Sequence, residues 1–184
     1  GIGLHIQEGD FVTVIGSNGA GKSTLLNIIA GTMLPDRGVV KIDHQNVTKK
    51  AEYSRARLIG RVFQDPLMGT APSMTIEENL ALSIKRFGRG LGPGINAQRR
   101  DFFQNKLAQL ELGLEKMLSK KVALLSGGQR QALTILMATM FDPKLLLLDE
   151  HTASLDPEIS KKIQAITQEI VQEKKLTTIM VTHN

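Results

Sequence analysis

The sequence predicts an α/β fold, with a core of strands and helices that is interrupted by an inserted helical segment. Short, β-rich apolar runs lie early and late in the chain, and a glycine-rich turn joins the first run to a pattern with helical spacing. Residues from about 65 to 125 follow a different pattern and indicate helices. The expected strands are Phe11–Ile15, Gly38–Asp43, Gly60–Gln64, Lys144–Asp149 and Thr177–Val181.

The early part of the chain carries clear signals for where its elements start and stop. Phe11–Ile15 ends at a glycine, which favours a buried strand with Phe11 in the core. The run "KSTLLNIIAG" has helical spacing and closes on Gly31, a typical helix end. The turn at Pro35–Gly38 then precedes the second expected strand.

The inserted segment has its own helix signals. Thr75 and Glu78 stand at capping-box spacing in "TIEENLALSIKRF". "NAQRRDFFQNKLAQLEL" is a second helical pattern, and "GRGLGPG" between the two indicates a loop. We therefore expect a core in two parts, residues 1–64 and 138–184, around a helical subdomain at residues 65–137.

Composition excludes several classes of protein. The 184 residues include no cysteine, so neither disulfides nor thiolate zinc sites are available. No apolar run approaches the roughly 20 residues that span a bilayer. The net charge is +5, but the lysine pairs are scattered, which favours solvated faces over nucleic-acid binding. The chain starts without methionine and stops at "MVTHN", so we expect a fragment truncated at both ends.

The turn "GSNGAGKST" matches the phosphate-binding pattern G-x-x-x-x-G-K-[ST] between an expected strand and an expected helix. Glycines let backbone N–H groups point at phosphate oxygens, and the helix N-terminus adds a favourable dipole. Lys22 would reach the β- and γ-phosphates, and the Ser23 hydroxyl could bind Mg²⁺. An ordinary glycine-rich turn is the alternative, but such a turn does not need the specified residue at every fixed position of this pattern. The nucleotide-binding candidates are Gly16, Ser17, Asn18, Gly19, Ala20, Gly21, Lys22, Ser23 and Thr24.

In the stretch "LLLLDEHTASLDP", four leucines are followed directly by two adjacent carboxylates, Asp149 and Glu150. In a protein with a phosphate cradle, an aspartate that ends such a strand can hold Mg²⁺ through water, which fits Asp149. Glu150 follows and could polarise a water lined up on the γ-phosphate. An exposed acid pair without function is the alternative.

"LSGGQRQ" resembles a second anion-binding helix terminus, with Ser126 as N-cap. A simple capped helix would explain the serine but neither the two glycines nor the glutamine. At this point the chain resembles the ATP-binding cassette (ABC) ATPases, P-loop NTPases with a RecA-like core sheet flanked by helices and an inserted helical subdomain. Their signature is LSGGQ, and it acts on the nucleotide of the opposite subunit in a head-to-tail dimer.

The resemblance extends along the whole chain in the family's order, and it implies one role for each motif. It makes ATP and Mg²⁺ the ligands, with Ser23, Gln64 and Asp149 at the metal and Glu150 as general base. Gln64 in "RVFQDP" would also sense the attacking water, and His183 in "VTH" would contact the γ-phosphate. Asp156 in "SLDP" would lie at the dimer interface. The signature residues that would act on the partner's nucleotide are Ser126, Gly127, Gly128 and Gln129.

Some positions depart from the commoner family pattern. His151 stands where proline is usual, Ala132 and Met137 stand where arginines are frequent, and His44-Gln45 replaces a turn that often has glycine. "DEHTASLDP" with "QRQAL" resembles bacterial transport ATPases with a permease like the branched-chain amino-acid type and a substrate-binding lipoprotein.

Two functions follow from the resemblance. The first is a transport motor that hydrolyses ATP as a dimer of two copies. It would lie at the cytoplasmic face of the membrane and drive transport of a solute through an integral membrane permease. The second is a soluble ABC ATPase acting on ribosomes or DNA. The short insertion between Gln64 and Ser126 and the intact "FQDP" loop favour transport.

Overall fold

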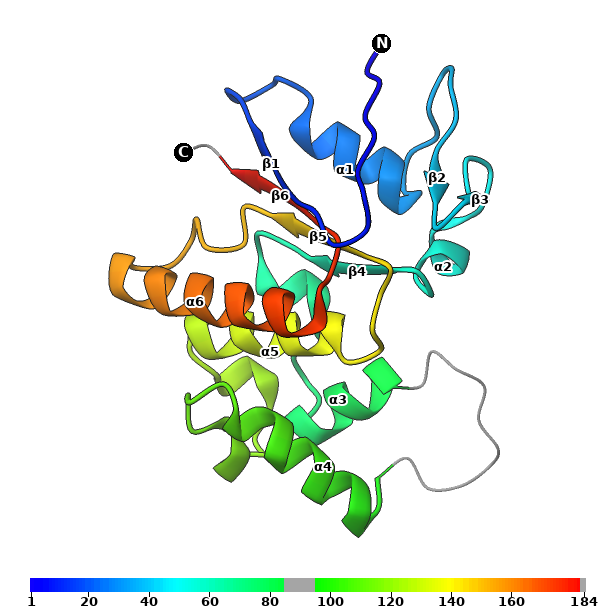
Figure 1. The fold of residues 1–184 in the computed structure, drawn as a ribbon. Coiled ribbons are helices and arrows are strands. Elements are labelled where there is room, and N and C mark those ends of the chain that lie inside the picture. Colours follow the sequence, from blue (N-terminus) through cyan, green and yellow to red (C-terminus); the bar gives the residue numbers. More distant parts are fainter. Residues whose placement is uncertain (85–94, 183–184) are drawn as a thin grey trace.

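The structure is a computed structural model that describes residues 1–84 and 95–182. At its centre lies a sheet of four strands in the order β1-β6-β5-β4, and all three neighbouring pairs are parallel (Figure 1). The strands are β1 (Phe11–Ile15), β4 (Ile59–Val62), β5 (Leu145–Asp149) and β6 (Thr178–Thr182). The predicted α/β class is therefore confirmed, and the order places the late strands β5 and β6 between the early strands β1 and β4.

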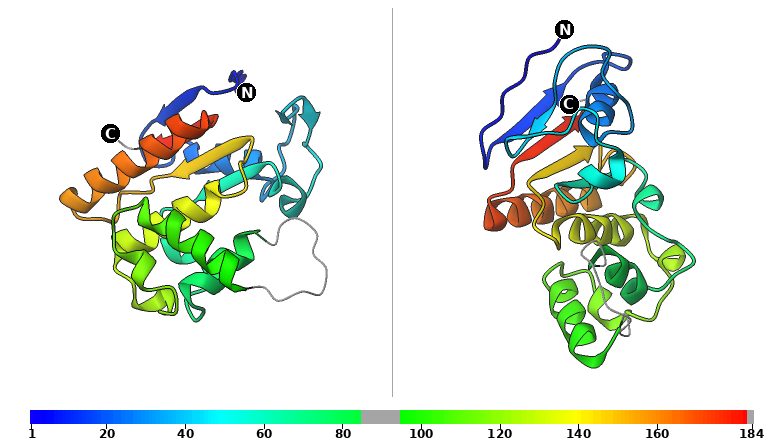
Figure 2. Two further views of the ribbon diagram at one scale, coloured as in Figure 1. Left: turned by 60° about the horizontal axis from the view of Figure 1, so that its bottom comes forward. Right: turned by 90° about the vertical axis from the view of Figure 1, so that its right-hand side faces the viewer.

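Helices cover both faces of this sheet (Figures 1 and 2). Helix α1 (Lys22–Ala30) lies on one face, and α5 (Gly127–Thr139) and α6 (Pro157–Lys174) lie on the other. Successive side chains of a strand point to opposite faces. Leu145 and Leu147 of β5 accordingly pack on the α1 side, whereas Leu146 and Leu148 pack among α5 and α6. The four leucines of this strand are buried because helices cover both of its faces.

The inserted segment packs against α5, on the side away from the sheet (Figure 1). It contains α3 (Ile76–Ile84), α4 (Ala97–Ala108) and the 3₁₀ turns η1 (Pro66–Gly69), η2 (Leu114–Lys116) and η3 (Val122–Leu124). The predicted capping box is present, since Thr75 N donates to Glu78 Oε2 at 2.7 Å and Glu78 N donates to Thr75 Oγ1 at 3.2 Å. The predicted loop at residues 88–94 lies outside the described residues.

A small hairpin and a short helix complete the α1 side. The hairpin strands β2 (Lys41–Ile42) and β3 (Gln45–Asn46) are antiparallel, and α2 (Glu52–Arg55) follows them. The expected strand at Gly38–Asp43 is thus shorter than predicted. Asp43 and His44 both have left-handed backbones, with φ of 49° and 61°, so they form the hairpin turn that glycine commonly makes.

The expectation that β1 is a buried strand is wrong. β1 is an edge strand of the sheet, and Phe11 and Ile15 are 45% and 65% exposed. Val14 packs with the α1 core, but the alternate side chains point to the other side of the strand, where they are exposed. The apolar run indicated a strand correctly, whereas its burial depended on neighbours that the pattern does not reveal.

Candidate functional site

The phosphate-binding turn lies between β1 and α1 and has the backbone shape that its glycines permit. Gly19 and Gly21 have φ of 81° and 91°, in the left-handed region that residues with a Cβ seldom adopt. Gly21 is the N-cap of α1, provides no side-chain cap, and is followed by no acidic residue in the first turn. The dipole and the N–H groups of this helix end are therefore not neutralised by a local carboxylate, which suits an anion.

Lys22 is folded across this turn. Its side chain is buried, and Nζ donates to the carbonyls of Gly16 at 2.6 Å and Ser17 at 3.1 Å. The neighbouring hydroxyl residues Ser23 and Thr24 are exposed, as are residues 17–21 of the turn. The structure thus gathers all nine predicted nucleotide-binding residues into one turn and the first turn of one helix.

The carboxylates at the end of β5 lie at the same edge of the sheet as this turn. Asp149 pairs with Val181 of β6, and Thr182 pairs with Ile15, the last residue of β1. Burial raises the pKa of Asp149, while the charges of Arg61 and Lys22 oppose that rise and Glu150 adds to it. The positive charge of Lys22 acts to lower the pKa of Asp149, so the phosphate-binding turn lies close enough for its charge to act on this carboxylate.

Glu150 occupies a sharp turn just beyond the strand. Its φ is 46°, an uncommon value for a residue with a side chain. The backbone is held on both sides, because Glu150 N donates to Val181 O at 3.1 Å and Ala153 N donates to Glu150 O at 2.9 Å. The turn fixes the direction in which Glu150 leaves the sheet, next to the carboxylate of Asp149.

The remaining predicted residues of this edge follow neighbouring strands. Gln64 is exposed and stands just after β4, whose Val62 pairs with Leu148 of β5. His183 directly follows β6 in the sequence, but it lies outside the described residues. Three of the predicted segments, the phosphate-binding turn, the end of β5 and the segment of Gln64, therefore meet at the carboxyl ends of parallel strands, where ligands of α/β proteins commonly bind.

The "LSGGQ" segment lies on the opposite face of the sheet from α1. Ser126 caps α5 through a complete capping box, with Gln129 N donating to Ser126 Oγ and Ser126 N donating to Gln129 Oε1, both at 3.2 Å. Gly127 is exposed, whereas Gly128 is buried against α6. A Cβ on Gly128 would lie 2.3 Å from Ile159 Cγ2, so close packing of the two helices requires this glycine.

Asp156 has a role within the chain that sequence analysis did not assign. It is the N-cap of α6, and its Oδ1 accepts a hydrogen bond from Ile159 N at 3.1 Å. The side chain is exposed, so this cap leaves the residue accessible at the surface beside Ser126 and Gly127.

Two further residues next to the motifs were missed by sequence reasoning. Arg61 in β4 contacts Asp149, and an arginine inside an otherwise apolar strand was the available signal. His151 is 3% exposed, and its Nε2 lies 3.3 Å from Thr167 Oγ1 in α6. Burial lowers the pKa of His151 to about 4, so the ring is neutral at physiological pH.

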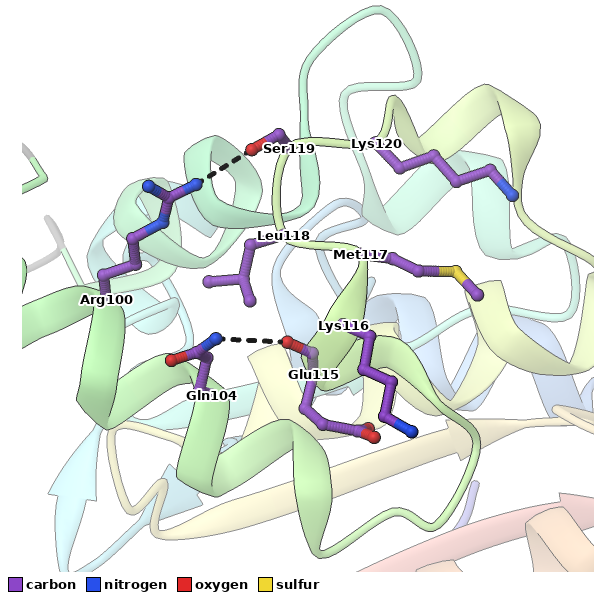
Figure 3. Close-up of a pocket in the computed structure, with 8 residues that line it drawn as sticks. All are labelled: Arg100, Gln104, Glu115, Lys116, Met117, Leu118, Ser119 and Lys120. Atoms are coloured by element: carbon purple, nitrogen blue, oxygen red, sulfur yellow. Dashed lines mark hydrogen bonds between the residues drawn. The ribbon is translucent and has the colours of Figure 1, made fainter.

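A cavity of about 530 Å³ opens in the inserted segment, away from these motifs (Figure 3). Arg100 and Gln104 of α4 form one wall, and residues 115–120 form the other. Two hydrogen bonds join its walls, with Arg100 Nη2 donating to Ser119 Oγ at 2.9 Å and Gln104 Nε2 donating to Glu115 O at 3.4 Å. The phosphate-binding turn differs from this cavity, because its residues 17–21 are exposed at the surface.

Comparison with known proteins agrees with the geometry. The sequence model of a family described as "ABC transporter" matches residues 1–153. The chain is 46% identical to the tyrosine transport ATP-binding protein of Clostridioides difficile (strain R20291), over 100% of this chain and 73% of that protein. It is 34% identical to the thiamine import ATP-binding protein ThiQ of Haemophilus influenzae (strain 86-028NP), over 98% of this chain and 79% of that protein.

A solved structure extends the comparison to three dimensions. It is described as a dimeric, post-hydrolysis state of the ATP-binding cassette MJ0796 bound to ADP and Pi. Its TM-score to this chain is 0.81 at 33% identity, and the match covers 98% of this chain and 78% of that one.

Proposed function

The chain belongs to the ABC transporter family and is an ATPase, and from that premise we propose that it powers solute import through a partner permease. The observation that carries this proposal is the meeting of the phosphate-binding turn, Asp149 and Glu150 at one edge of the sheet. Relatives with 46% and 34% identity are named for tyrosine transport and thiamine import, which supports the role.

ATP would bind with its phosphates on the turn between β1 and α1. The uncapped N-terminus of α1 and the side chain of Lys22 would neutralise the phosphate charge. Lys22 Nζ now bonds to carbonyls of its own turn, so the nucleotide would replace Gly16 O and Ser17 O as its partners. The exposed residues 17–21 leave room for this approach.

Mg²⁺ fits the donors at this edge. The described residues hold no cluster of three or more acidic, histidine or cysteine side chains that could bind a metal. Mg²⁺ in nucleotide sites needs no such cluster, because it binds one or two protein groups together with phosphates and waters. Ser23, Asp149 and Gln64 would be those groups, and the bound ion would neutralise charge on the β- and γ-phosphates.

The chain's own residues would then direct hydrolysis. Glu150 would accept the proton of the attacking water, Gln64 would orient that water, and His183 would contact the γ-phosphate. The turn at Glu150 fixes its backbone by two hydrogen bonds, which favours a defined position for the carboxylate.

A second copy would complete each site. The segment Ser126–Gln129 lies across the sheet from α1, which favours action on the nucleotide of a partner over action on its own. Gly127 and Asp156 are both exposed beside it and would meet that partner. The similar structure of MJ0796 is described as a dimer, which supports a head-to-tail pair.

The permease would contact the inserted segment. A hollow of about 330 Å³ lies between η1, α3 and α5, and Met68 on its rim is 69% exposed. No helix in residues 1–84 and 95–182 is long and apolar enough to cross a bilayer. We propose a peripheral position at the cytoplasmic face, a permease of the branched-chain amino-acid type and a substrate-binding lipoprotein.

Affinity purification from membranes tests the transport role. We expect the tagged protein to recover an integral membrane subunit, and Met68→Asp to lose it because a charge would replace an exposed apolar side chain on the rim of the hollow. Tyr53→Asp is the matched control, since Tyr53 is 81% exposed on α2, outside the hollow. Recovery of ribosomes or DNA in place of a membrane protein would overturn the proposal.

A further inference from the structure

Arg61 joins three of the motif segments through one side chain. It lies in β4, and its side chain is only 13% exposed. Nη2 donates to Asn27 Oδ1 in α1 at 2.7 Å and lies 3.8 Å from Asp149 Oδ2. The guanidinium carbon is 4.6 Å from the centre of the Phe63 ring, one residue before Gln64.

Strand register explains why these groups meet. Arg61 of β4 pairs with Leu147 of β5 in parallel register. Side chains two residues apart share a face, so Arg61 lies on the same face as Leu147 and Asp149, which is the face that α1 covers. The charge is thus inserted between the helix of the phosphate-binding turn and the carboxylate at the strand end.

The environment of Arg61 is electrostatically demanding. A buried cation is costly unless an anion or a full set of hydrogen bonds compensates it. Burial lowers the pKa of Arg61, and the largest opposing influence is the charge of Asp149, followed by that of Glu52. Asp149 is therefore the main compensating charge for Arg61. The charge of Arg61 is in turn the largest influence that opposes the rise in the pKa of Asp149.

Arg55 shows what a structural arginine looks like in the same molecule. It is fully buried, and its nitrogens donate to four backbone carbonyls, those of Ile28, Ile29, Thr48 and Lys50, at 2.6–2.9 Å. Arg61 differs, because its Nε is buried without a hydrogen-bond partner among the described residues. Packing alone does not account for Arg61, whereas a role toward Asp149 does.

We propose that Arg61 is a positioning residue that orients the Asp149 carboxylate toward the phosphate-binding turn and ties it to α1. This inference rests on the proposed function, in which Asp149 binds Mg²⁺. Phe63 extends the link to the segment that carries Gln64, because its ring lies against the guanidinium. The group that contacts a metal-binding carboxylate sets its orientation, and losing such a group typically weakens metal binding about 10- to 100-fold.

The experiment measures how Mg²⁺ changes the affinity of the protein for a fluorescent ATP analogue. Arg61→Met keeps the bulk of the side chain and removes the charge and the donors. We expect about a tenfold rise in the Mg²⁺ concentration at half-effect, with metal-free nucleotide affinity unchanged. Arg61→Lys keeps a charge but loses the planar guanidinium, whose Nη2 contacts both Asn27 and Asp149, so we expect a rise of about threefold.

Controls separate the possible failures. Arg57→Met removes an exposed arginine four residues earlier and should leave the Mg²⁺ response unchanged. Asp149→Ala should abolish the response; if it does not, the proposed metal role of Asp149 fails. If Asp149→Ala does abolish it but Arg61→Met and Arg61→Lys respond like the wild type, the positioning role alone is overturned. If Arg61→Met does not fold, it will fail to bind the ATP analogue even without metal. The Mg²⁺ response of Arg61→Lys then decides whether the positioning role holds.

Discussion

Alanine at Gly128 tests the contact between the start of α5 and the start of α6. A Cβ there would lie 2.3 Å from Ile159 Cγ2, far inside the contact distance of about 3.5–4.0 Å between carbon atoms. Ile159 is β-branched and lies in the first turn of α6, where one χ1 rotamer is strongly preferred. The methyl group cannot easily rotate away, so we expect a cost of about 1–3 kcal/mol for the forced shift.

Gly127→Ala is the matched control for this change. Both glycines lie in the first turn of α5, so alanine improves the helix propensity by up to about 1 kcal/mol in either case. The Cβ at position 127 would lie 3.2 Å from Leu155 Cδ2, the end of a flexible side chain that can move. The difference between the two variants therefore isolates the clash with Ile159.

Thermal unfolding of the two variants measures this difference. For a domain of this size, 1 kcal/mol shifts Tm by about 2–4 °C, so Gly128→Ala should unfold roughly 2–12 °C below Gly127→Ala. Ile159→Ala removes the obstructing methyl, so the double variant should be less destabilised than the sum of its single changes. Equal stability of the two glycine variants, or strict additivity with Ile159→Ala, would refute the reasoning.

Two further predictions concern the signature and a buried histidine. Ser126→Arg should leave ATP affinity of the isolated monomer unchanged but abolish ATP-dependent dimerisation, because a bulky cation would fill the partner's phosphate position. Ser126→Ala, which loses the hydroxyl and its cap at about 1 kcal/mol but adds no bulk or charge, is the comparison, and a monomer that no longer binds ATP would contradict action on the partner's nucleotide. His151 has a pKa of about 4 when folded against an ordinary value of 6.5, so the unfolded chain takes up its proton first as pH falls. Its contribution to stability is complete above about pH 6.5 and should fall by about 2 kcal/mol between pH 7 and pH 5. Chemical denaturation of His151→Leu at both pH values should show a correspondingly flatter dependence, and an unchanged one would contradict the assignment.

The sequence predicted the structure best where a single physical requirement explains the residue type at a position. The strand Leu145–Asp149 and the turn Gly16–Gly21 are set by local requirements, namely burial on two faces and positive φ, so both were predicted correctly. The capping box at Thr75 is equally local. Local patterns of this kind identified most of the candidate site.

Features that depend on distant neighbours were not predictable in this way. Phe11 was expected in the core, but the edge position of β1 follows from the strand order of the whole sheet. Gly128 was predicted as a signature residue that acts on the partner's nucleotide, but its packing against Ile159 in another helix was not predicted. Arg61 became informative only when strand register placed it beside Asp149.

The rate of ATP hydrolysis by Glu150→Gln, compared with the wild type at saturating Mg²⁺, tests the central claim most directly. Glutamine keeps the size and hydrogen bonding of the side chain but cannot take a proton from water. General-base catalysis typically contributes about 10²–10⁴-fold, so we predict that turnover falls by that order while ATP still binds. Turnover at the wild-type rate would contradict the assignment of Glu150 as the base at this edge of the sheet.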